Sequence, residues 1–372
     1  MKEKRMGVGF IGCGGHCCGS NIPCAARNPK LKIIGFCDLR QEPLEKLKEQ
    51  YNSKFITNDM ERIFSDPEIG MVICATKPDF RLPVMELAVK YKKPLFVEKP
   101  VAYTYEDTLK AVSIMKNSGV PFIVGFNRPY SPMMQAIRPI YERQKNGNTL
   151  ISYRIVGEGH IWPPEHQHAV YVKKESTVLH ETTHIFDLLN WLTRSAPVKV
   201  YMTGGGNIDN MITLTYPDNV FSNIMAGDNG TVGYPKEKID INTNYGTIVG
   251  DFFAEMWAVR CGDDSGKTLF PYMWNGKKGK MNGRKYAEVL WKWRDGVTEE
   301  QRKTGHYFGE FPAISKGHYE QQEYFRKCII SGKPPETDVL RGAIANITGW
   351  KAVESWQKGQ VVDLDFSFLN EL

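Results

Sequence analysis

Two histidines and an aspartate recur at helical spacing in the segment His180-Glu-Thr-Thr-His184-Ile-Phe-Asp187. At about 100° per residue, His180, His184 and Asp187 fall within an arc of about 60° on a helix predicted over about residues 180–192. An imidazole titrates near neutral pH and can accept a proton from a hydroxyl group. The spacing therefore predicts His184 as a general base oriented by Asp187, with His180 on the same face. Packed or surface histidines are the alternative.

The same segment also spells His-Glu-x-x-His, a pattern that binds zinc in metalloproteases with the glutamate as base. Further ligands are missing, because Asp187 and Asn190 stand where one class of these enzymes has glycine and histidine. We therefore predict no metal site, and an accessory metal on His180 and His184 stays open.

A glycine-rich turn, Gly12-x-Gly14-x-x-Cys17, follows the first predicted strand and opens a helix. Such glycines let the backbone approach a pyrophosphate, whose charge is met by amides at the helix N-terminus. The next strand ends at Asp38, which can accept hydrogen bonds from both ribose hydroxyls and would repel a 2′-phosphate, so NAD is predicted over NADP. The predicted cofactor-binding residues here are Gly12, Gly14, Gly15, His16, Cys17, Asp38 and Arg40.

Simpler explanations exist for these features. The glycines could serve a tight turn between strand and helix, and Asp38 could cap the helix that follows. Arg40 could pair with a 2′-phosphate and weaken the preference for NAD, or it could stack on the adenine.

Three further polar motifs follow predicted strands at their carboxyl ends, where ligands bind in open α/β sheets. They are Thr76-Lys77-Pro78, Glu98-Lys99-Pro100 and Asn127-Arg128. Together with the glycine turn, they resemble the glucose-fructose oxidoreductase / inositol dehydrogenase (Gfo/Idh/MocA) family of NAD(P)-dependent oxidoreductases. The resemblance covers nearly the whole chain, and the Glu-Lys-Pro motif is its most specific part.

The resemblance implies that Lys99 lies beside the nicotinamide and the substrate hydroxyl. It implies a cofactor lining made by Thr76, Lys77, Pro78, Glu98, Asn127 and Arg128. His184 and Asp187 match the family's second signature, whereas His180 stands where the family often has aspartate. Chemistry independently favours such a lysine, because an ammonium stabilises the alkoxide that develops as hydride leaves. A solvated lysine at a strand end is the alternative for Lys99.

A loop after residue 156 carries Glu158, His160 and Trp162. Sugar recognition combines hydrogen-bonding groups with an aromatic face, so this loop is predicted as a wall of the substrate site. The other predicted substrate-binding residues are Lys99, Arg128, His180 and His184. A loop with incidental histidines is the alternative.

Short apolar runs that alternate with amphipathic segments position the first group of motifs. The predicted strands cover residues 7–11, 31–37, 70–75, 94–97 and 121–125, and the predicted helices cover 41–51, 80–91 and 104–118. Strands separated by helices need crossover connections, which gives a parallel sheet with helices on both faces. Residues 1–126 are therefore predicted as a doubly wound, dinucleotide-binding Rossmann domain.

After residue 126 the pattern changes to strand-like segments joined by turns, which predicts a mainly antiparallel open sheet. Its strands are expected at residues 150–156, 198–203, 212–216, 221–226, 238–243, 246–252 and 255–260. Residues 127–372 are predicted as an α+β domain for substrate binding and oligomerisation, and a helix at about 340–357 could pack back on the first domain. The family resemblance implies subunits packed through this sheet, hence a homo-oligomer.

The composition, with 41% hydrophobic and 24% charged residues in 372, is that of an ordinary globular protein. No run approaches the ~18 consecutive apolar residues of a membrane helix, so a cytoplasmic protein without a membrane partner is predicted. Five of the six surplus positive charges lie within residues 277–285, which leaves no basic face for nucleic acid. The eight cysteines include no C-x-x-C pair and are predicted to be free thiols.

These observations predict an NAD-dependent enzyme that removes a hydride from a secondary hydroxyl of a sugar, cyclitol or glycoside. Oxidation of a glycoside at C3 is the specific expectation. Two other classes stay open: an NAD-dependent glycoside hydrolase or lyase that oxidises its substrate only transiently, and a non-catalytic nucleotide-binding regulator.

Overall fold

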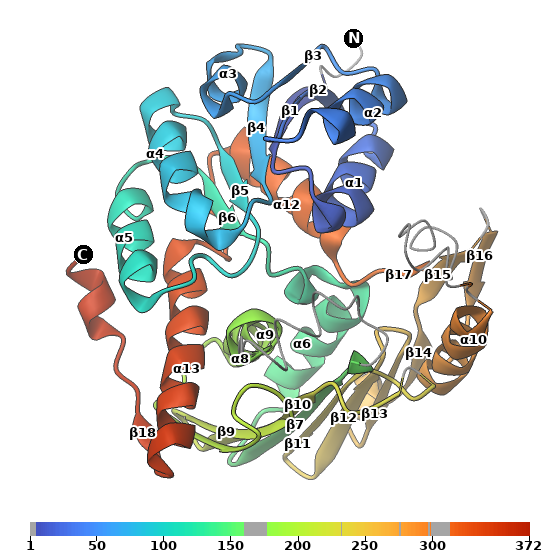
Figure 1. Cartoon of the computed structure of the whole chain (residues 1–372). Coiled ribbons are helices and arrows are strands. Elements are labelled where there is room, and N and C mark those ends of the chain that lie inside the picture. The colour runs from blue at the N-terminus through green and yellow to red at the C-terminus, as the bar shows by residue number, and fades with distance from the viewer. Residues whose placement is uncertain (1–4, 160–176, 232, 275–276, 297, 299–312) are drawn as a thin grey trace. The chain divides into compact units, whose positions relative to one another are not determined.

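A computed structural model describes residues 5–159, 177–231, 233–274, 277–296, 298 and 313–372 (Figure 1). The chain divides into two compact units. The first comprises Met1–Asn127, His318–Ile347 and Phe366–Leu372, and the second comprises Arg128–Gly317 and Thr348–Asp365. Two segments from the C-terminal part of the chain thus group with the first unit.

The first unit contains a six-stranded sheet in the order β3-β2-β1-β4-β5-β6, in which every neighbouring pair is parallel. The strands are β1 (Met6–Ile11), β2 (Leu31–Cys37), β3 (Phe55–Thr57), β4 (Ile69–Cys74), β5 (Leu95–Val97) and β6 (Phe122–Val124). This confirms the predicted doubly wound sheet. Strand β3 was not predicted, since its three residues are only half-buried and do not form the apolar run that β5 and β6 have.

Helices connect these strands. They are α1 (Ile22–Arg27), α2 (Gln41–Tyr51), α3 (Met60–Ser65), α4 (Arg81–Tyr91), α5 (Tyr105–Met115) and, from the later chain, α12 (His318–Ser331). Helix α12 packs against α1, and the Gln321 side chain donates to the carbonyl of Val124 at the end of β6, over 2.7 Å. The order of the strands reverses between β1 and β4, and ligands bind at such a point in open α/β sheets.

The second unit contains a nine-stranded sheet in the order β14-β13-β12-β11-β7-β10-β9-β8-β18. The strands are β7 (Thr149–Val156), β8 (Lys199–Gly204), β9 (Asn210–Tyr216), β10 (Val220–Gly227), β11 (Glu237–Thr243), β12 (Gly246–Asp251), β13 (Glu255–Val259), β14 (Gly266–Leu269) and β18 (Val362–Asp363). The predicted mainly antiparallel sheet is confirmed. One pair, β7 with β10, is parallel.

The remaining elements of the second unit lie around this sheet. A three-stranded sheet has the order β16-β15-β17. Its strands and the further helices are β15 (Pro271–Trp274), β16 (Lys277–Lys280), β17 (Ala313–Ile314), α6 (Pro132–Gln144), α8 (Thr177–His180), α9 (Thr183–Thr193) and α10 (Gly283–Asp295). Helix α13 (Val339–Lys358) has residues in both units. None of the described helices has the length and apolar character needed to cross a membrane.

The prediction of one helix over about residues 180–192 is wrong at its start. Helix α8 ends at His180 and α9 begins at Thr183. The amides of Glu181 and Thr182 both donate to the carbonyl of Thr177, which interrupts the regular hydrogen-bond pattern. All residues of α9 are buried, including those on the face expected to carry functional groups.

Candidate functional site

The glycine turn lies between β1 and the first helix. Gly12 has a φ of +84°, and a Cβ atom built there would lie 2.6 Å from the backbone nitrogen of Thr76. Glycine is therefore required at this position. A Cβ atom on Gly14 or Gly15 would meet nothing within 4 Å, so the turn offers an open backbone surface of the kind that a pyrophosphate needs.

The helix after this turn begins with a π-helical turn, Cys17–Asn21, that leads into α1. Cys17 is buried. A hydrogen bond with the Cys13 thiol and burial raise the pKa of Cys17, so it is a neutral, small side chain. A small residue suits this position because the helix packs closely on the strand.

Asp38 follows β2 and faces the glycine turn. Its Oδ2 accepts the backbone N–H of Cys13 over 2.8 Å, and its Oδ1 accepts the backbone N–H of Arg40 over 3.0 Å. The Arg40 guanidinium also bonds both carboxylate oxygens, at 3.1 and 3.3 Å. Burial alone would raise the pKa of Asp38, but these hydrogen bonds hold it below its usual value. A charged carboxylate therefore stands beside the turn.

Glu98, at the end of β5, is buried in the same unit. Its Oε1 lies 3.3 Å from Nε2 of His16 and accepts a hydrogen bond from the Asn21 amide over 3.0 Å. Burial alone would raise the pKa of Glu98, but the charge and hydrogen bond of His16, helped by Asn21, lower it to about 2. A Cβ atom on Gly125 would lie 2.8 Å from the carboxylate, so this glycine makes room for it.

Arg81, the first residue of α4, joins the ends of β4 and β5. Its Nη2 and Nε donate to the carbonyl of Thr76 over 2.9 and 3.2 Å, and Nη2 reaches the carbonyl of Lys99 at 3.4 Å. Its Nη1 donates to the carbonyl of Pro100. The guanidinium is buried, and burial lowers the pKa of Arg81. Arg81 thus holds the two segments that carry Thr76 and Lys99, with Lys99 itself half-buried.

Arg81 was not among the predicted site residues. An arginine at the start of a predicted helix gives no signal that its side chain turns inward. The other predicted residues of this segment differ in exposure, since Pro78 is buried and Lys77 is exposed. Asn127, after β6, is buried.

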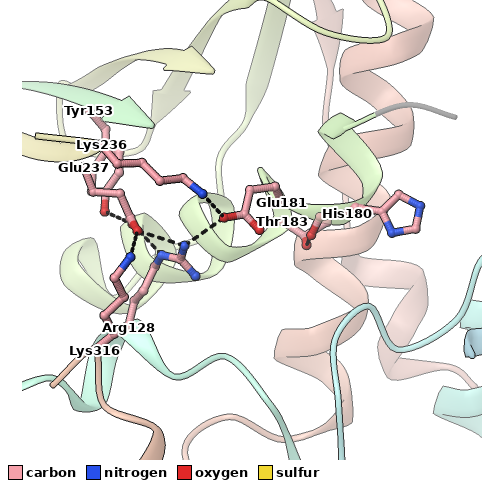
Figure 2. Close-up of polar contacts among 8 residues, drawn as sticks. All are labelled: Arg128, Tyr153, His180, Glu181, Thr183, Lys236, Glu237 and Lys316. Atoms are coloured by element: carbon pink, nitrogen blue, oxygen red, sulfur yellow. Dashed lines mark hydrogen bonds and ion pairs between the residues drawn. The ribbon is translucent and has the colours of Figure 1, made fainter. Parts of the chain in front are cut away.

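A charged network occupies the second unit (Figure 2). Arg128 donates to both carboxylate oxygens of Glu237, from Nε over 2.6 Å and from Nη2 over 3.1 Å, and Nη2 also reaches Glu181 at 3.2 Å. Lys316 and the hydroxyl of Tyr153 donate to Glu237 over 2.8 and 2.9 Å. Lys236 donates to Glu181 over 3.2 Å. Arg128, predicted as a ligand-binding residue, is therefore held by two carboxylates.

Burial and charge oppose each other within this network. Glu237 is 1% exposed, yet the charges of Arg128 and Lys316 hold its pKa far below the usual range. Nearby carboxylates raise the pKa of Arg128 despite its burial. Both groups are therefore ionised at neutral pH. Glu237 was not among the predicted site residues, because a glutamate at the end of a strand is usually solvated.

The predicted base and its neighbours lie close to this network along the chain. His184 is buried, and its amide donates to the carbonyl of Glu181 over 3.2 Å. Asp187, one turn later, is buried near Tyr216, where burial and the Asp187 charge raise the tyrosine pKa. Figure 2 shows the His180 ring on the side of Glu181 away from Lys236 and Glu237.

Residues of the His-Glu-x-x-His pattern and of the predicted substrate wall have charged partners in the structure. Among the described residues, no three His, Cys, Asp or Glu side chains gather as they would around a metal ion. The glutamate of the His-Glu-x-x-His pattern, Glu181, bonds Arg128 and Lys236. Glu158 pairs with Arg294 at 3.4 Å, and His160 and Trp162 lie outside the described residues.

Comparisons with known proteins identify similar oxidoreductases. Residues 6–126 match the family model GFO_IDH_MocA, described as an oxidoreductase family with an NAD-binding Rossmann fold. A myo-inositol 2-dehydrogenase of Thermotoga maritima is 22% identical over 336 residues, 90% of this chain and 91% of that protein. Residues 6–126 are thus assigned to the Gfo/Idh/MocA family of oxidoreductases.

Two further similar proteins extend the comparison. A 2,7-anhydro-N-acetylneuraminate hydratase of Escherichia coli is 25% identical over 299 residues, 76% of each chain. The fold matches that of a scyllo-inositol dehydrogenase from Lactobacillus casei, solved with NAD(H) and scyllo-inositol, with a TM-score of 0.70 and 15% identity over 97% of this chain and 99% of that one. The chain therefore has the fold of this dehydrogenase, and its glycine turn and Asp38 fit NAD, the cofactor that the matching family model describes.

Proposed function

We propose that this oxidoreductase transfers a hydride between NAD(H) and a secondary hydroxyl of a sugar, cyclitol or glycoside. The observation that carries the proposal is Lys99 at the carboxyl end of β5. Its carbonyl is held by Arg81 and its neighbour Glu98 is fixed by His16 and Asn21, within an NAD-binding fold. Relatives that act on inositols support a polyhydroxylated substrate.

Each residue has a proposed part in the reaction. Bound NAD would supply the acceptor for the hydride. The amides of the glycine turn bind its pyrophosphate and Asp38 binds the adenosine ribose. The Lys99 ammonium donates to the substrate oxygen and stabilises its developing negative charge, while His184 accepts the hydroxyl proton and Asp187 orients it. Glu98 and Thr76 line the cofactor, and the loop that begins at Glu158 contacts the substrate.

A screen for NADH formation tests this proposal. Purified protein is incubated with NAD and a panel of sugars, inositols and glycosides, including glycosides that allow oxidation at C3, and absorbance of the reduced nicotinamide is followed. Lys99→Ala should lower turnover at least about 100-fold, the loss typical when one preorganised donor is removed. Lys110→Ala, which removes an exposed lysine of α5, is the control. Unchanged turnover in Lys99→Ala contradicts the proposed role.

A second candidate is a reaction with no net oxidation, which the hydratase among the relatives favours. Transient oxidation makes the neighbouring carbon acidic, elimination follows, and the hydride returns from NADH. Release of a sugar or an aglycone without accumulation of NADH would support this NAD-dependent hydrolase or lyase over the dehydrogenase.

The outer face of the nine-stranded sheet supports a homo-oligomer. Large apolar side chains stand exposed on it, including Leu150, Phe221, Met225 and Trp257. Leu150 and Phe221 are direct neighbours across β7 and β10, and exposed apolar side chains gathered on a surface are typical of protein–protein contacts. We include a homo-oligomer packed through this face in the proposal, and a cytoplasmic location stays a prediction.

A further inference from the structure

Asp228 directly follows β10 and is 9% exposed. Its amide donates to Oδ1 of Asp209 over 3.0 Å, and its carbonyl accepts the amide of Gly159 over 2.7 Å. The backbone is thus fixed on both sides, whereas the carboxyl group accepts no hydrogen bond from the described residues. A buried carboxyl group without such a bond is costly unless another molecule supplies one.

The structure makes room for this carboxyl group. A Cβ atom on Gly157 would lie only 2.2 Å from Oδ1 of Asp228. Strand β7 ends just before Gly157, and β7 and β10 run parallel, so both strands deliver their ends to the same edge of the sheet. The bare glycine therefore allows Asp228 to take the position that it has.

Three charged groups act on Asp228 electrostatically: Lys236 before β11, Glu181 before α9, and Asp209 before β9. Lys236 is close in space, because its Cε and Oδ1 of Asp228 both lie within 4 Å of a Cβ atom built on Gly157. Lys236 lowers the pKa of Asp228 and the two carboxylates raise it, but burial is the largest effect, and the pKa is about 7. The Lys236 side chain is 28% exposed, and its ammonium makes one hydrogen bond, to Glu181, among the described residues. Its other ammonium hydrogens can bond a ligand.

The pair lies beside the helix that carries the proposed base. Lys236 bonds the Glu181 side chain, and the Glu181 carbonyl accepts the amide of His184 in the first turn of α9. A group bound by Asp228 and Lys236 would thus lie against the start of this helix.

We propose that Asp228 and Lys236 form a subsite for two neighbouring hydroxyl groups of a neutral polyol. The carboxylate accepts the hydroxyl hydrogens, and the ammonium donates to the hydroxyl oxygens. An acidic sugar is rejected here, because Asp228 and Glu181 would repel its carboxylate. This inference rests on the proposed function and names its substrate class as neutral.

Binding measurements on the full-length protein test the subsite. NADH-saturated protein is titrated calorimetrically with neutral probes, namely myo-inositol, scyllo-inositol and methyl glucosides, and with D-glucuronate as the acidic probe. Asp228→Asn should weaken binding of the best neutral probe at least about 10-fold, as expected for hydrogen bonds to a charged group. Gly157→Ala, which displaces the Asp228 carboxyl group, should also weaken binding of that probe.

The matched control is Asp251→Asn. Asp251, at the end of β12, also has an oxygen without a hydrogen bond among the described residues and a pKa raised by burial to about 6. It lies outside the proposed subsite, so its substitution should leave affinity unchanged. Wild-type affinity for the neutral probe should also fall as the pH drops below about 7, because Asp228 must be ionised to accept two hydroxyls.

The outcomes separate the subsite from the proposed function. Equal affinity of wild type and Asp228→Asn for a neutral probe overturns the subsite alone. So does tighter binding of D-glucuronate than of every neutral probe by the wild type, since an acidic sugar would then be the preferred ligand. Wild-type protein that binds NADH but no probe of either class contradicts the proposed function, and the subsite with it.

Discussion

Replacement of Glu237 by glutamine should destabilise the second unit strongly. Glu237 is 1% exposed and accepts two hydrogen bonds from Arg128, one from Lys316 and one from Tyr153. Glutamine keeps the shape of the side chain but removes its charge, which leaves two cations without their shared carboxylate. The glutamine amide would also point its N–H hydrogens at one of these two cations.

The magnitude follows from the burial of this group. Removing one partner of a buried ion pair costs about 3–5 kcal/mol, because the remaining charge stays away from water. The second unit comprises residues 128–317 and 348–365. For a unit of about 200 residues, this loss corresponds to a fall of roughly 6–20 °C in Tm.

Chemical and thermal unfolding, followed by circular dichroism between pH 3 and pH 8, measures the effect. Because the pKa of Glu237 is lowered in the folded state, its contribution is present above the unfolded value of about 4.3 and is lost as the pH falls below it. The difference between wild type and Glu237→Gln should therefore be full at neutral pH and shrink in acid.

An exposed glutamate provides the matched control. Glu288 on α10 also pairs with two cations, Lys285 at 3.0 Å and Lys292 at 2.7 Å, but it is solvent-exposed. Glu288→Gln should leave the unfolding midpoints almost unchanged, since exposed ion pairs contribute little to the free energy of unfolding. A Glu237→Gln protein that is as stable as Glu288→Gln, or whose deficit is the same at every pH, refutes the reasoning.

Four further predictions concern the cofactor, the proposed lysine and the assembly. Gly12→Ala should abolish NADH binding, measured by fluorescence titration, because its Cβ atom would collide with the Thr76 backbone; binding with wild-type affinity would contradict this. Asp38→Ala should weaken NADH binding about 10-fold and reduce the preference for NADH over NADPH, measured from the two dissociation constants, since it removes a charged acceptor; an unchanged preference would count against the assignment of Asp38. Arg81→Met should lower kcat more than it raises the KM for NAD, because it frees the carbonyls beside Lys99; a purely structural role would instead change only the Tm. Met225→Glu with Trp257→Glu should shift the mass from light scattering toward the monomer, and an unchanged oligomer would place the interface elsewhere.

Local pattern determined the fold of the first unit. Apolar segments that alternate with amphipathic helices, and glycines spaced around a strand end, predict a parallel sheet because each signal lies within a few neighbouring residues. The same holds for the hairpins β9–β10 and β11–β12, which the sequence predicted from turn residues and alternating strands. The glycine turn, Asp38 and the Glu-Lys-Pro motif could be identified in the sequence for this reason.

Tertiary structure decided which charged residues are buried and what they bind. Arg81, Glu237 and Asp228 stand at helix starts and strand ends, where sequence analysis expects solvated groups. Arg128 and Glu237 are 109 residues apart, and no local period connects them. The break between α8 and α9 was equally unpredictable, because the Glu181 side chain bonds Arg128 and Lys236, which lie far away in the sequence. The sequence thus determined the elements and their order, while burial of charge depended on distant partners that only the folded chain brings within hydrogen-bonding distance.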